Sequence, residues 1–74
     1  MSRMKLRLAR IENGLSQKEL AKIIGVSQQT IAKWEKGITT PSQFSQIRQI
    51  SKELDIKPAA IFPDVFSYKE PIAK

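Results

Sequence analysis

The chain has 74 residues and contains no cysteine and no histidine. Disulfide bonds are therefore excluded, and so are metal sites that need thiolate or imidazole ligands. The absence of cysteine fits a reducing cytoplasm, where we expect the protein to act. Without cross-links or metals, a chain of this length closes one small hydrophobic core, so we expect a single domain.

Long apolar runs are also absent. No stretch approaches the ~20 apolar residues that a membrane helix needs. The basic start alternates charged with apolar residues, unlike a signal peptide. We therefore expect no membrane partner. Hydrophobic residues still make up 41% of the chain, which argues against disorder over its whole length.

The residues that catalysis usually requires are scarce as well. Serines are present, but no histidine stands ready to activate one, and no motif brings two carboxylates together. We therefore expect neither an enzyme nor a cofactor nor a metal site.

Basic residues are concentrated in the first half of the chain. Residues 1–37 hold eight basic and three acidic residues, a net charge of +5, whereas residues 38–74 hold five and four. This distribution is expected if the first half faces a polyanion such as DNA or RNA. On charge alone, a solvated basic face is an equally good interpretation.

Capping residues and glycines predict three helices in the first half. Ser16 and Glu19 form the capping-box pattern S-x-x-E, and Ser27 is a suitable N-cap for the helix that follows. Each of the three helices is expected to end at a glycine: Gly14, Gly25 and Gly37. The helices are expected to cover residues 4–13, 17–24 and 28–36.

Two more helices are predicted in the second half. Ser42 is expected to cap a helix that ends near Asp55 and buries one stripe of apolar residues: Phe44, Ile47, Ile50 and Leu54. Pro58 suits the first turn of a short helix over residues 59–62. No stretch shows the alternation of a strand, so the expected fold is all-α with five helices.

Residues 17–36 meet the requirements of two short helices that cross steeply. Such a pair needs a small residue at the contact, a glycine at the turn and apolar residues facing the core. Ala21 is the small residue, and Gly25 stands at the turn, where a positive φ would strain any side chain. The apolar positions are Leu20, Ile24, Val26, Ile31 and Trp34.

This stretch resembles the helix-turn-helix of the lambdoid phage repressors and Cro proteins, the Xre-type family. The resembling run is RIENGLSQKELAKIIGVSQQTIAKWE, residues 10–35, followed by Lys36-Gly37 and Pro41. The resemblance implies a five-helix, lambda-repressor-like DNA-binding domain over residues 1–63, with its motif at residues 17–36 and a C-terminal tail at residues 64–74. It also implies a short, Cro-like regulator.

The resemblance implies that the helix over residues 28–36 enters the major groove and presents its first residues to base edges. Gln28 and Gln29 are the leading base readers, because an amide offers adenine a donor and an acceptor side by side. Lys33 is expected to bond guanine or a phosphate, and Thr30 a phosphate or a thymine methyl group.

Other residues are expected to contact the DNA backbone. Gln17 matches the family position that holds a phosphate and often braces the first recognition glutamine, and the free N–H groups of its helix favour that anion. The weaker candidates are Ser27, Lys36, Thr39, Thr40 and Ser42, of which we expect about half to contact phosphate.

Arg10 and Glu35 match a pair that forms a structural, partly buried salt bridge in the family. Trp34 is expected to lie in the core rather than stack on bases. Two departures from the family pattern stand out: Ala9 replaces a larger aliphatic residue, and the loop before the fourth helix lacks basic residues. The second departure argues against readout of the minor groove.

The expected partner is a double-stranded DNA operator, bound by a homodimer, because one short helix rarely reads enough sequence. The apolar tail sequence at residues 65–68 has three interpretations: packing on its own core, pairing with a second subunit, or disorder. The predicted function is a transcriptional regulator, a repressor of phage or mobile-element type. The alternative is a protein-binding antirepressor or antitoxin on the same fold.

Overall fold

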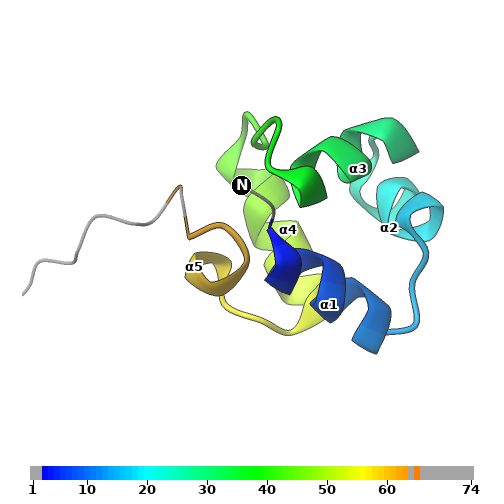
Figure 1. The fold of residues 1–74 in the computed structure, drawn as a ribbon, viewed down its shortest axis with the longest axis horizontal. Coiled ribbons are helices and arrows are strands. Elements are labelled where there is room, and N and C mark those ends of the chain that lie inside the picture. The colour runs from blue at the N-terminus through cyan, green and yellow to red at the C-terminus, as the bar shows by residue number, and fades with distance from the viewer. Residues whose placement is uncertain (1–2, 64, 66–74) are drawn as a thin grey trace, which may run out of the picture.

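The computed structural model describes residues 3–63 and residue 65. These residues form five α-helices and their connecting loops and contain no strand (Figure 1). The helices are α1 (Met4–Glu12), α2 (Gln17–Ile24), α3 (Gln28–Lys36), α4 (Phe44–Leu54) and α5 (Pro58–Ile61). The all-α prediction with five helices is confirmed, and the helix ends agree with the expected ones to within one residue.

The predicted caps of α2 and α3 are confirmed. The Ser16 hydroxyl accepts the backbone N–H of Glu19 at 3.0 Å, and the Glu19 carboxylate accepts the backbone N–H of Ser16 at 2.7 Å. Ser27 accepts the backbone N–H of Thr30 at 3.1 Å. Gly25 closes α2 in the left-handed conformation, with φ of 90°. Both helices of the motif are therefore delimited by local interactions.

The start of α4 differs from the prediction. Gln43, not Ser42, is the N-cap, and no side chain caps the helix. Phe44 is 63% exposed and does not join the buried stripe of Ile47, Ile50 and Leu54. At about 100° of rotation per residue, Phe44 lies about 90° away from the centre of that stripe. Its spacing of three from Ile47 was therefore misleading.

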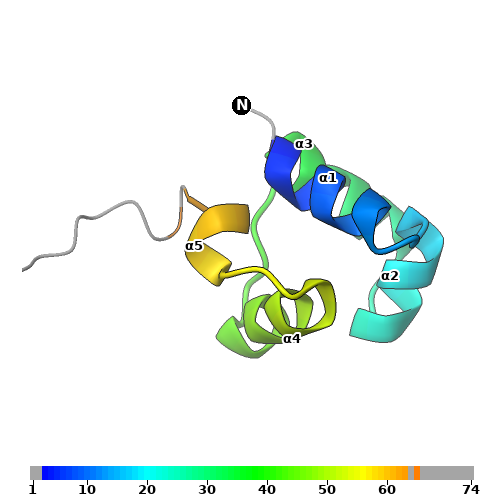
Figure 2. The same ribbon diagram turned by 90° about the horizontal axis from the view of Figure 1, so that it is seen from below.

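Each helix contributes to one core (Figures 1 and 2). α2 packs most extensively against α3, α1 contacts α3 and α5, and α4 contacts α2 and α5. The prediction that Trp34 lies in the core is confirmed. The buried apolar residues are Leu6, Ala9, Leu20, Ala21, Ile24, Ile31, Trp34, Ile47, Ile50, Leu54, Ile61 and Phe62.

The described part of the chain ends beside this core. Val65 is half-buried and packs against the core cluster. The other residues of the apolar tail sequence lie outside the described residues, so the three interpretations of the tail stay open. Within the described residues, no helix is long and apolar enough to cross a membrane.

Gly25→Ala should lower the free energy of unfolding by about 1 kcal/mol, because a side chain strains the left-handed backbone. Space is not the cause, since an added Cβ would meet no atom within 4 Å beyond its chain neighbours. Thermal unfolding by circular dichroism should show a Tm lower by about 4–8 °C. Gly25→Asn is the control and should cost less, so equal losses would contradict this explanation.

Candidate DNA interface

The first two residues of α3, Gln28 and Gln29, are both exposed. Lys33 follows Gln29 at a spacing of four and is also exposed. Residues spaced by four lie on the same face of a helix, so Gln29 and Lys33 share one face of α3. Three of the four predicted base readers, Gln28, Gln29 and Lys33, are therefore exposed on α3.

The fourth predicted base reader, Thr30, is half-buried. Its hydroxyl shares a hydrogen bond of 2.9 Å with the hydroxyl of Ser27, which also caps the helix. Both hydroxyls are thus engaged in the first turn of α3, although each oxygen retains a further lone pair for an outside donor. Of the predicted base readers, Thr30 is the least accessible.

A chain of polar contacts leads from the core to Gln28. The Gln17 side chain donates to the Glu35 carboxylate, with an N–O distance of 3.0 Å. The Gln28 side-chain amide donates to the side-chain amide oxygen of Gln17, with an N–O distance of 3.5 Å. Gln17 therefore occupies the bracing position that the family resemblance implied.

The Arg10–Glu35 salt bridge is confirmed as a structural feature. Arg10 Nε lies 2.5 Å from one Glu35 oxygen, and the two side chains are 10% and 4% exposed. A second guanidinium nitrogen donates to the backbone carbonyl of Leu15, at 2.8 Å. Arg10 thus ties α1 to α3 and to the loop before α2, and its burial keeps it from the DNA surface.

The weaker backbone candidates lie in two places. Lys36 is exposed in the last turn of α3, and Ser27 at its beginning. Thr39, Thr40 and Ser42 are exposed in the loop between α3 and α4. This loop follows directly from the C-terminal end of α3, the helix that carries the predicted base readers. Its hydroxyls therefore lie at the opposite end of α3 from Gln28 and Gln29.

A comparison with protein-family models matches residues 6–61, about three quarters of the chain, to a helix-turn-helix family. The chain belongs to the Xre, or lambda-repressor-type, helix-turn-helix family. Its fold and its general role as a DNA-binding transcriptional regulator follow from this membership. The expected family and fold class are thereby confirmed.

Solved structures support the same assignment. The chain is similar to the restriction-modification controller protein C.AhdI from Aeromonas hydrophila, whose crystal structure superposes with a TM-score of 0.67. The two chains are 30% identical, and the similarity covers 80% of this chain and 84% of the controller protein. No curated protein sequence matches this helix-turn-helix protein significantly.

A groove of about 360 Å³ lies among residues of α1, α2 and α3 on this helix-turn-helix domain. Gln17 and Lys36 line it on one side, and Arg7 lines it from α1. Arg7 was counted in the basic half of the chain but was not predicted as a contact. The sequence offered no signal for it beyond charge, because only tertiary packing brings α1 beside the phosphate candidates.

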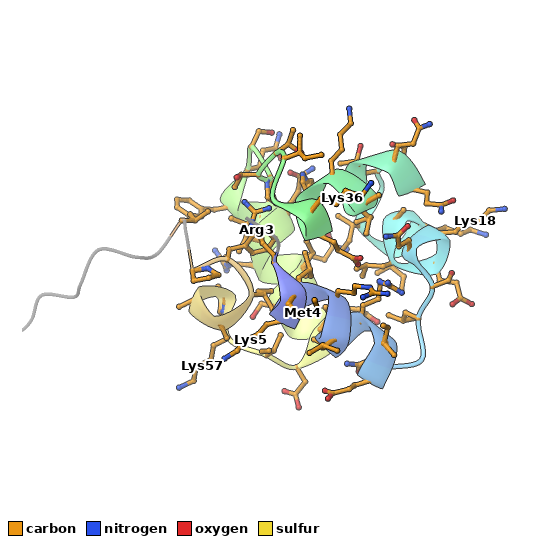
Figure 3. All side chains as sticks on the ribbon, viewed as in Figure 1. Arg3, Met4, Lys5, Lys18, Lys36 and Lys57 are labelled. Carbon is orange, nitrogen blue, oxygen red and sulfur yellow. The ribbon has the colours of Figure 1, made fainter. Side chains whose placement is uncertain are left out.

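Burial changes the interpretation of the basic half. As whole residues, Arg3 and Arg10 are only 6% and 8% exposed, so two of the eight cations in this half are buried. Figure 3 shows Arg3 beside the end of α3, whereas Lys5 lies toward α5. The distribution of charge therefore overstated how much of this half faces a polyanion.

Glu35→Ala should unfold the domain. The variant leaves the Arg10 guanidinium buried without its counter-charge, at a cost of about 3–5 kcal/mol. A core of this size supplies roughly that much net stability. Circular dichroism should show loss of the folded state, and DNA binding should be lost with it.

Glu12→Ala is the control for this variant, because Glu12 is an exposed carboxylate on α1. It should change stability by less than about 0.5 kcal/mol. A Glu35→Ala protein with an unchanged Tm would show that the buried pair does not hold the fold together.

Proposed function

We propose that the protein is a transcriptional repressor that binds a double-stranded DNA operator through α3. The observation that supports this most directly is the exposure of Gln28 and Gln29 at the start of the helix, with Gln28 held by Gln17. An exposed amide pair at the N-terminal end of a recognition helix is suited to base edges in the major groove.

The hydrogen-bonding capacity of Gln28 suits adenine. One N–H of its amide is directed to Gln17, which leaves one N–H and the carbonyl oxygen free to face a base. Adenine presents an acceptor, N7, beside a donor, the N6 amino group, in the major groove. At 3.5 Å this contact is long, so it favours one orientation of the amide without fixing it.

Backbone contacts would come from the edges of this surface. We propose that Gln17, Lys36 and Arg7 hold phosphates around the groove between α1 and α3, because two of them are cations and all three line it. Lys33 would add a base or phosphate contact farther along α3. The loop residues Thr39 and Thr40 would contribute at the other end of the helix.

Repression follows if two copies bind side by side and cover a promoter. A homodimer would place two α3 helices about 34 Å apart on one face of the DNA. We propose that this takes place in the cytoplasm. The similarity to a restriction-modification controller adds the promoters of such a system to the phage and mobile-element promoters implied by the resemblance.

A protein-binding antirepressor or antitoxin is the second candidate, and one observation favours it. Met4, Leu8 and Ile11 lie on one side of α1 at spacings of four and three, and each is about half exposed. Apolar side chains that share one helix face are suited to packing against another protein. No DNA contact is proposed for Leu8 and Ile11, whereas Met4 also lines the groove beside α3.

Gln28→Ala should cost about 1–3 kcal/mol on the best duplex and relax the preference at one base position. Gln17→Ala should weaken binding to all duplexes alike, because the main loss is a phosphate contact that carries no sequence information. Binding titrations on the best duplex and on its single-base variants distinguish these patterns. If both variants lost the same affinity on every duplex, the assignment of reading and bracing roles would be wrong.

Gln49→Ala is a matched control for both glutamine variants. Gln49 lies on α4 and donates to the backbone carbonyl of Ile23, away from the first turn of α3. In Figure 2, α4 lies on the opposite side of the domain from α1 and α3. This variant should leave affinity and base preference unchanged.

Selection of bound duplexes from a random DNA pool at two salt concentrations tests the proposal as a whole. We expect a palindrome with two short half-sites about one helical turn apart. Placed over a promoter, the selected duplex should give less transcript in vitro when the protein is added. Weak binding that vanishes with salt and enriches no sequence would instead favour the protein-binding candidate.

A further inference from the structure

Arg3 is a buried cation at the end of the recognition helix. It precedes α1 and lies outside the residues matched by the family model, which begin at residue 6. It is nevertheless only 6% exposed. A long charged side chain is rarely buried to this degree unless polar partners surround it. The burial of Arg3 therefore depends on its hydrogen-bond acceptors.

Its guanidinium donates hydrogen bonds to the last turn of α3 and to the loop that follows. One guanidinium nitrogen donates to the backbone carbonyls of Trp34, at 2.6 Å, and Thr39, at 2.7 Å. The other terminal nitrogen donates to the Thr40 hydroxyl at 2.7 Å. The backbone N–H of Arg3 donates to the Glu35 carbonyl at 2.7 Å.

Two general effects favour a cation at this position. The last carbonyls of a helix lack partners within the helix, and the negative end of the helix dipole attracts positive charge. The guanidinium also stands over the Phe62 ring, 5.0 Å from its centre, in a cation–π arrangement. Arg3 therefore joins α3, the α3–α4 loop and the residue after α5.

The loop that Arg3 holds is the one that carries Thr39 and Thr40. Both side chains are exposed and belong to the proposed phosphate contacts. An exposed loop without internal fixation would lose conformational freedom on binding DNA. Because Arg3 bonds a backbone carbonyl of one threonine and the hydroxyl of the other, it fixes both before DNA arrives.

We propose that Arg3 is a positioning residue for DNA binding, which presets the α3–α4 loop and the end of α3 for the phosphate backbone. The inference rests on the proposed backbone role of this loop. Arg3 itself does not meet the DNA, because its guanidinium is buried against protein acceptors. It acts through Thr39 and Thr40.

This role predicts an unusual salt dependence. A cation that contacts phosphate releases counterions, and its removal lowers the slope of log affinity against log salt by about 0.9 per contact. Removal of a positioning cation lowers affinity at every salt concentration but leaves that slope unchanged. The slope therefore separates an indirect role from a direct contact.

The experiment compares the full-length wild type with Arg3→Met and Arg3→Lys. Methionine keeps an apolar side chain without donors, whereas lysine keeps the charge but lacks the planar fork that serves several acceptors. Affinity is measured over a series of salt concentrations on the selected operator and on an unrelated duplex of equal length. The temperature is one at which circular dichroism shows every variant to be folded.

Arg3→Met should weaken binding to both duplexes at least tenfold with an unchanged salt slope. Arg3→Lys should recover part of the loss. Amide hydrogen exchange in Arg3→Met should accelerate at Gly37 and Ile38, whose N–H groups bond carbonyls in the last turn of α3, while the amides of α2 keep their protection. This readout reports on the loop directly and requires no DNA.

Two matched cation variants complete the test. Lys36→Met, which removes a proposed phosphate contact, should lower the salt slope by about 0.9. Lys5→Met removes an exposed cation that points toward α5 and should change affinity less than twofold (Figure 3). Together they calibrate what a direct contact and a distant charge do in this protein.

A folded Arg3→Met protein with wild-type affinity would overturn the proposal and leave Arg3 a stabilising residue only. A salt slope lowered as in Lys36→Met would overturn it in favour of a direct phosphate contact. Failure of the proposed function is distinguishable, because wild type would then bind neither duplex or would not prefer the operator. If wild type binds no duplex at all, the positioning role fails with it.

Discussion

A buried ion pair between Arg10 and Glu35 holds α1 against α3. Both side chains lie in the interior, where an unpaired charge is strongly destabilising. Moving α1 away from α3 would leave both charges without a partner and would therefore destabilise the fold. Glu35 also accepts a hydrogen bond from Gln17, which in turn accepts one from Gln28. A single carboxylate thus couples the stability of the core to the orientation of the first residue of α3.

Two buried arginines, Arg3 and Arg10, bind α3 at different points. Arg10 binds a side chain in its last turn, and Arg3 binds the backbone carbonyls at its C-terminal end. Each guanidinium serves several acceptors at once, which an ammonium group cannot do with the same geometry. The exposed cations, such as Lys33 and Lys36, remain available for a polyanion. Under the proposed function, the basic residues therefore have two roles: Arg3 and Arg10 hold α3 in place, and the exposed lysines contact DNA.

Family membership explains the shared frame but not the specificity. The similarity to the controller protein C.AhdI extends over most of both chains at 30% identity. The buried positions of the motif, among them Ala21 and Trp34, are what two helices need in order to cross, whatever DNA they read. Under the proposed function, specificity depends on exposed side chains at the start of α3, which can change without disturbing the core.

The positions of the five helices, the helix-turn-helix motif and the candidate base-reading residues could be predicted from the sequence. Capping boxes and left-handed glycines act within about four residues, so α2 and α3 could be predicted to the residue, and the exposure of Gln28 and Gln29 follows from the motif. The exposure of Phe44 could have been predicted from its helical phase, whereas the burial of Arg3 could not. Whether a side chain is covered depends on elements far along the chain, and the Arg3 hydrogen bonds span 31 to 37 residues. Only the tertiary structure brings the start of the chain beside the end of α3, because that contact is made by packing and not by local pattern.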